Sequence, residues 1–83
     1  GSSVEEVGWA SEVTYRRAEA QVTLCVPQAG QVSIVSLSGM VVRNASLAAG
    51  IKTDISVKDL PSGLYFVRIV TGGRVQIKEI VIP

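Results

Sequence analysis

Short runs of alternating apolar and polar residues, separated by turns rich in glycine and proline, repeat along this chain of 83 residues. A period of two is typical of strands that bury one face, and no stretch shows the 3.6-residue period of an amphipathic helix. The sequence therefore predicts an all-β fold of six or seven short strands packed as an antiparallel sandwich. The expected strands cover residues 12–17, 20–26, 31–38, 40–46, 51–57, 64–70 and 75–82.

The most informative segment is a turn followed directly by a strand, at residues 59–70. Pro61 fixes φ early in a tight turn, and Gly63 can adopt a positive φ without steric cost. Leu60 and this turn precede Tyr65, at the start of a run of aromatic and β-branched residues. A tyrosine so placed is typical of the tyrosine corner, in which the hydroxyl bonds to backbone a few residues upstream. We therefore predict an immunoglobulin-like antiparallel β-sandwich with Greek-key connections, in which the Tyr65 ring is buried.

Two further stretches carry local signals. In residues 31–38 the alternation slips by one if Leu37 faces the core together with Ile34, which predicts a bulge near Val35 and Ser36 or a strand covered on both faces. Gly39 follows as the residue able to adopt the left-handed conformation of a tight hairpin.

The second half of the chain continues the pattern. In residues 51–57 the odd-numbered positions are apolar or threonine and the even-numbered ones polar, so we expect a half-buried strand that includes Ile51. Gly72 and Gly73 predict a two-residue hairpin. In the last strand we expect the apolar side chains to change face at Lys78 and Glu79. The side chains on the two faces are Val75 and Ile77, then Ile80 and Ile82.

Composition narrows the function. The chain has one cysteine, Cys25, and no histidine, so it has no internal disulfide, no cysteine-cluster metal site and no Ser-His or Cys-His pair. We expect no cofactor and no enzymatic activity, with Asp54, Asp59 and Glu79 as solvated carboxylates. The net charge of +1 favours neither nucleic acid nor an anionic membrane. Charged residues make up 18%, against about 25% in typical domains, which fits either a dense core or an apolar partner face.

The first eleven residues have a different character. The opening Gly1-Ser2-Ser3 is typical of a cloning remnant, so we expect this chain to be part of a longer protein. We predict that residues 1–11 form a tag remnant and flexible linker and that residues 12–83 form the domain. Trp9 is expected to cover an edge of the sandwich.

Three features in a fixed order resemble a known family. They are Leu-Ser-Gly at 37–39, Leu-Pro-Ser-Gly-Leu-Tyr at 60–65, and Lys78 in the closing strand. This order and spacing is similar to the C-terminal sorting domain of cargo proteins of the type IX (Por) secretion system, over about residues 20–83. The ending Ile80-Val81-Ile82-Pro83 departs from the basic or polar ending that is common in the family.

The resemblance implies a secretion signal at the end of a larger exported cargo. The cargo would cross the inner membrane by a separate signal, pass through the periplasm and be recognised by the outer-membrane secretion machinery. A sortase-like protease would then remove the domain by a cut within the region of residues 1–11. The cargo would end at the cell surface, anchored to lipopolysaccharide, or be secreted.

Two sets of residues follow from this reading. Gly39, Leu60, Pro61, Gly63 and Tyr65 are expected to shape the backbone. The strand at 75–83 and adjacent turns are expected to face the receptor, for example by strand addition. The candidate recognition residues are Lys78, Glu79, Ile80, Val81, Ile82 and Pro83.

An alternative reading is an immunoglobulin-like or fibronectin-like spacer with a structural or adhesive role, which the turn and Tyr65 fit equally well. Exposed edges and the apolar excess are also compatible with a homodimer. We expect no nucleic-acid partner and no small-molecule substrate.

Overall fold

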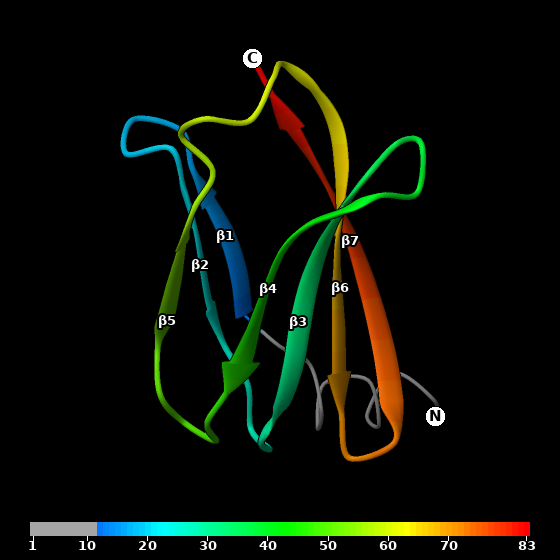
Figure 1. Cartoon of the computed structure of the whole chain (residues 1–83). Coiled ribbons are helices and arrows are strands. Elements are labelled where there is room, and N and C mark those ends of the chain that lie inside the picture. Colours follow the sequence, from blue (N-terminus) through cyan, green and yellow to red (C-terminus); the bar gives the residue numbers. More distant parts are fainter. Residues whose placement is uncertain (1–11) are drawn as a thin grey trace, which may run out of the picture.

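The computed structural model describes residues 12–83, which form seven β-strands and no helix (Figure 1). Each strand lies within two residues of a run expected from the alternation, which confirms the all-β prediction. Within this part of the chain no helix has the length and hydropathy needed to cross a membrane. The strands are β1 (Glu12–Arg16), β2 (Gln21–Cys25), β3 (Gly30–Ser36), β4 (Val41–Leu47), β5 (Thr53–Ser56), β6 (Gly63–Thr71) and β7 (Arg74–Ile82).

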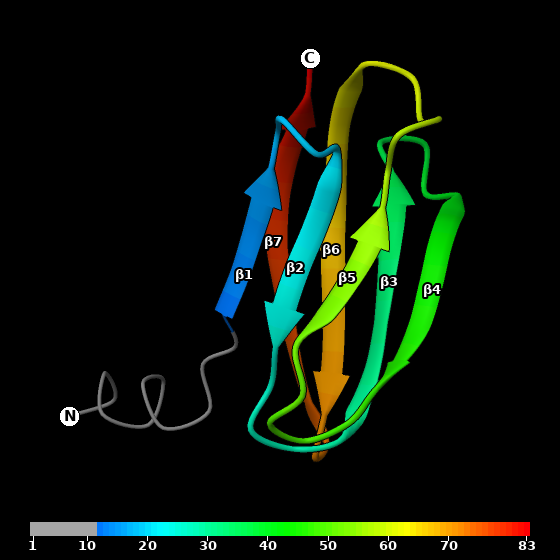
Figure 2. The same cartoon turned by 90° about the vertical axis from the view of Figure 1, so that its left-hand side faces the viewer.

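The strands form two antiparallel sheets that face each other (Figure 2). One sheet has the order β1-β2-β5 and the other the order β4-β3-β6-β7. The chain crosses between the sheets after β2, β4 and β5, so that β5 returns beside β2 and β6 beside β3. This interlocked order is the predicted Greek-key sandwich, and it is not a closed barrel. β1 begins at one end of the sandwich and β7 finishes at the other (Figure 1).

The core lies between the sheets and is built from alternate residues of the strands. β6 contributes Tyr65, Val67 and Ile69 to it from an interior position in the four-stranded sheet. Each fully buried aliphatic side chain stabilises the fold by about 1.5–3 kcal/mol relative to an exposed one. The buried apolar residues are Val22, Leu24, Val26, Val32, Ile34, Leu47, Ile55, Val57, Tyr65, Val67, Ile69, Ile80 and Ile82.

Two residues expected to face the core are exposed. Leu37 is 71% exposed because β3 ends at Ser36 and Leu37 lies in the hairpin turn. Ile51 is 59% exposed because β5 begins only at Thr53. In both cases the apolar residue lies beyond the end of the strand, where no neighbouring strand fixes which way its side chain points.

The predicted bulge is present but its extra residue lies in the partner strand. The register shifts between Ile34 and Val35, which pair with Arg43 and Val41, so Val42 of β4 is unpaired. Val42 packs against the core instead. The slip in the sequence of β3 therefore reflects the end of that strand, while the bulge itself belongs to β4.

This bulge lies beside a residue that joins the two sheets on their open side. Arg43 donates from Nε to the carbonyl oxygen of Ser56, at 3.1 Å, and its guanidinium pairs with the Asp59 carboxylate. Arg43 belongs to the edge strand of the four-stranded sheet, whereas Ser56 ends the edge strand of the other. The side chain therefore connects β4 to the segment that leaves β5.

In the last strand the apolar side chains change face as predicted, and the strand contains no bulge. The pairing of β7 with β6 is continuous from Thr71↔Arg74 to Gly63↔Ile82. The hairpin turn consists of Gly72 and Gly73, both with positive φ, as a two-residue turn of type I′ requires. The expectations for residues 1–11, including the linker and the position of Trp9, lie outside the described residues.

Replacing Arg43 with methionine should lower the free energy of unfolding by about 1 kcal/mol, because the methionine keeps most of the apolar stem and loses the bonds to Ser56 and Asp59. The value is small because the Asp59 side chain is largely exposed. Chemical denaturation followed by circular dichroism measures it. The matched control is Arg17→Met, in the exposed turn after β1, which should leave the midpoint unchanged. Equal midpoints for Arg43→Met and the unmodified protein would contradict this role.

Candidate recognition surface

The segment that crosses from β5 to β6 is held by a hydrogen bond from Tyr65. The Tyr65 hydroxyl donates to the carbonyl oxygen of Pro61 at 2.7 Å, four residues upstream, and the residue is only 6% exposed. Both features of the predicted tyrosine corner are thus confirmed. Leu60 packs against the core from the same segment, while Pro61 is exposed.

Two glycines adopt backbone conformations that other residues rarely adopt. Gly63, the first residue of β6, has φ of 149°, and Gly39, in the β3–β4 turn, has φ of 92°. Gly39 lies in a hairpin closed by the bond from the Ser36 N–H to the Met40 carbonyl oxygen, at 2.8 Å. The sequence motifs at 37–39 and 60–65 therefore lie at turns of the sandwich, and each contains a glycine whose positive φ the turn requires.

The six candidate recognition residues divide between the core and the surface. Ile80 and Ile82 are buried between the sheets. The others, Lys78, Glu79, Val81 and Pro83, are exposed. A partner that meets the folded domain can therefore contact these four residues, whereas the two isoleucines fix β7 to the sandwich.

β7 is an edge strand with a single neighbour, β6. In an antiparallel pair closed by a two-residue turn, the residues flanking the turn exchange both hydrogen bonds, and every second pair after them does the same. The intervening residues direct their N–H and C=O groups away from the neighbouring strand. In β7 these residues are Val75, Ile77, Glu79 and Val81, and no backbone partner for them occurs among residues 12–83.

The outer face of the four-stranded sheet is mostly apolar over β6 and β7, where Arg68 and Glu79 interrupt it, and polar over much of β3 and β4. Across the strands, Val41 pairs with Val35, Val35 with Phe66 and Leu64 with Val81. We use the term outer apolar face for the residues Val35, Val41, Leu64, Phe66, Val70, Val75, Ile77 and Val81. The sequence signalled such a face only through its low charge and the apolar residues on both faces of the last strand.

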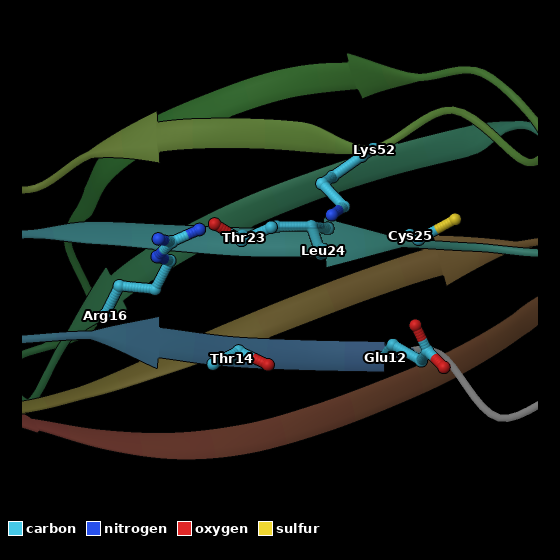
Figure 3. Close-up of a pocket in the computed structure, with 7 residues that line it drawn as sticks. All are labelled: Glu12, Thr14, Arg16, Thr23, Leu24, Cys25 and Lys52. Carbon is cyan, nitrogen blue, oxygen red and sulfur yellow. The ribbon is translucent and has the colours of Figure 1, made fainter. Parts of the chain in front are cut away.

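The outer face of the three-stranded sheet is polar by comparison. A shallow depression there is lined by Glu12, Thr14, Arg16, Thr23, Leu24, Cys25 and Lys52 (Figure 3). The Thr23 hydroxyl donates to Asp54 and Arg16 pairs with Glu19, so these groups satisfy one another. The Cys25 thiol is free and partly covered. Within residues 12–83 no three Cys, Asp or Glu side chains gather as a metal site would require.

The fold and the Tyr65–Pro61 bond define the class: an immunoglobulin-like sandwich with a tyrosine corner and an open apolar edge. Sequence comparison then gives the family. The chain belongs to the secretion system C-terminal sorting domains, whose family model matches residues 18–83. No curated protein matches the sequence.

Family membership decides between the two readings of the sequence. The domain is a C-terminal sorting signal for type IX secretion, which a spacer of the same fold would not be. Membership of this family implies that the domain interacts with the type IX machinery and that a cargo domain lies upstream of it. It also implies export across the outer membrane to the cell surface or the medium. A sorting-signal family also points to a role without catalysis.

Tyr65→Phe should lower the free energy of unfolding by about 1 kcal/mol, because it removes the hydroxyl and leaves the Pro61 carbonyl oxygen without this donor. Thermal or urea denaturation followed by circular dichroism measures the change. Tyr15→Phe is the matched control, since the Tyr15 ring is also partly buried and its hydroxyl has no hydrogen-bond partner among the described residues. A Tyr65→Phe midpoint as high as that of the control would contradict the tyrosine-corner role.

Gly63→Val should destabilise the domain by about 1–3 kcal/mol, because a β-branched side chain strains the backbone at this φ. Gly39→Val should act in the same direction. Space is not the cause, since a Cβ at Gly63 meets nothing closer than the Tyr65 ring at 4.0 Å. Thermal melts compare both variants with Ser62→Val, an exposed loop position without positive φ. An unchanged midpoint for Gly63→Val would refute the requirement.

Proposed function

We propose that the outer-membrane secretion machinery recognises this domain at β7 and the adjacent turns, and that a strand of the receptor adds to the free edge of β7. The observation that carries this proposal is the edge itself. Nine residues, Arg74–Ile82, are presented as a regular strand with outward-directed backbone groups on one side. Strand addition uses such groups for affinity and alternate side chains for specificity.

The candidate residues have two roles in this proposal. Lys78, Glu79, Val81 and Pro83 meet the receptor, because they are exposed on the last strand and beyond it. The buried Ile80 and Ile82 hold the strand straight against β6. The receptor therefore meets a preformed edge and does not have to order a flexible tail.

We further propose the route that the family resemblance implies. The domain is folded in the periplasm during transit and has no catalytic activity. Residues 12–83 form the sorting domain and residues 1–11 the linker, where a sortase-like protease cuts after export. The cargo is then released or attached to the cell surface.

Deleting residues 78–83 from a cargo or a fluorescent reporter fused ahead of this domain should trap the fusion in the periplasm. Cell fractionation and surface protease accessibility, in a bacterium with this export route, measure the result. Normal surface display of the deleted form would contradict the proposal. Since the deletion also removes Ile80 and Ile82 from the core, a second variant is needed to separate recognition from folding.

That variant is Glu79→Pro, with Glu79→Ala as its matched control. Glu79 is one of the residues whose N–H points away from β6, so proline there removes an edge donor while the β6 ladder remains. Glu79→Ala removes the same carboxylate and keeps the N–H. We expect a much larger loss of export for Glu79→Pro than for Glu79→Ala, which removes only one side-chain contact with the receptor, with a cooperative thermal transition retained in both. Equal export of the two variants would contradict strand addition.

A further inference from the structure

The two faces of β7 have opposite chemistry along its first half. Directly opposite residues of an antiparallel pair lie on the same face, so Lys78, which pairs with the buried Val67, lies on the face directed toward the core. Ile77, Glu79 and Val81 lie on the outer face, and the two apolar residues Ile77 and Val81 are 59% and 64% exposed. A strand added to β7 would therefore place the side chains of one face beside Lys78 and those of the other face beside Ile77, Glu79 and Val81.

Lys78 restricts which strands can pair with the free edge of β7. The residue is exposed, and no ion pair or side-chain hydrogen bond of Lys78 occurs among residues 12–83. A charged side chain on the inward face of an edge strand is a common device against unwanted edge pairing, since an added strand would cover the charge. A strand with an opposite charge at the neighbouring position compensates best for the lost hydration, because a charge-assisted hydrogen bond is stronger than one to a neutral acceptor.

The outer side of the same edge offers a place for an apolar side chain. Val35, Phe66, Arg68 and Ile77 line a shallow depression of about 330 Å³. This volume is at the small end of ligand pockets, so the depression suits a single large side chain better than a small molecule. Ile77 belongs to β7 and Phe66 to β6, so the depression lies within reach of a strand placed about 4.8 Å beyond β7.

We propose that the receptor segment is an amphipathic strand that alternates apolar and acidic residues. Its apolar side chains cover Ile77 and Val81 and extend the outer apolar face, and one of them seats in the depression beside Phe66. An acidic side chain on its other face pairs with Lys78. This inference rests on the proposed strand addition at β7 and specifies the partner's chemistry.

A second copy of this domain that pairs through its own β7 does not fit the same edge. The positions of β7 that share the face of Lys78 contain no acidic residue. Any pairing of two β7 strands that matches their faces therefore places Lys78 opposite a basic, amide or apolar side chain. Those positions are Arg74, Gln76, Lys78, Ile80 and Ile82.

The test is the surface display of the reporter fusion with Lys78→Glu, with Lys78→Arg as the matched control. We expect display to fall about tenfold or more for Lys78→Glu, because like charges then face each other across the added strand, and to remain near the unmodified level for Lys78→Arg. Ile77→Ser should also reduce display, whereas Ile77→Val should not. Thermal melts of the isolated domain verify that all four variants fold.

The outcomes separate this inference from the proposed function. If deletion of residues 78–83 and Glu79→Pro abolish display while Lys78→Glu is displayed normally, strand addition stands and the acidic partner is wrong. If Glu79→Pro is displayed like Glu79→Ala, strand addition itself is wrong and the inference falls with it.

A direct measurement identifies the partner segment. A photoreactive phenylalanine analogue is placed at position 77 in the exported fusion, and the cross-linked receptor peptide is sequenced. We expect a membrane-protein segment in which apolar residues alternate with at least one Asp or Glu. A segment without an acidic residue, or a cross-link to a second copy of the domain, would overturn the inference. Sedimentation of the purified domain should likewise give a monomer, and a dimer abolished by Glu79→Pro would overturn it.

Discussion

The packing of the inner face of β6 against the facing sheet is the contact on which the structure depends. Tyr65, Val67 and Ile69 belong to an interior strand, and their side chains are buried. Each of them pairs with a residue of β3 on one side and a residue of β7 on the other. Because successive side chains alternate, burying these three fixes every outward residue of the same sheet as well. The position of Lys78 toward the core and of Ile77 toward solvent is thus set by the core. The candidate recognition surface and the hydrophobic core therefore depend on the same register.

Much of this fold could be predicted from the sequence because its determinants are local. Two-residue alternation located all seven strands, and the turn residues around Pro61 and Gly63 predicted the Tyr65 hydrogen bond, which spans only four residues. The prediction was wrong at Leu37 and Ile51, which are apolar but lie beyond the end of a strand and are exposed. Where a strand ends depends on its neighbours in the sheet, and the period of a single run does not contain that information.

The features that sequence reasoning missed connect distant parts of the chain. Arg43 and Asp59 are 16 residues apart and meet only because β4 and β5 lie at the same open side of the sandwich. The outer apolar face likewise needs the register of four strands before Val35, Phe66 and Ile77 can be placed together. The Asp59 side chain is largely exposed, as expected of a solvated carboxylate, and it also pairs with Arg43. The candidate recognition residues at the end of the chain remain a prediction, although their division into buried and exposed members is now known.

The opposite placement of the start of β1 and the end of β7 has a mechanical consequence (Figure 1). A cargo joined ahead of Glu12 and a receptor holding β7 would apply tension at opposite ends of the sandwich. Such a load runs parallel to the strands, so it shears many backbone hydrogen bonds at once and does not peel them apart singly. The Gly63–Ile82 pairing, at the last residue of β7, lies where that tension would enter. A domain loaded in this way would resist unfolding through many hydrogen bonds at once.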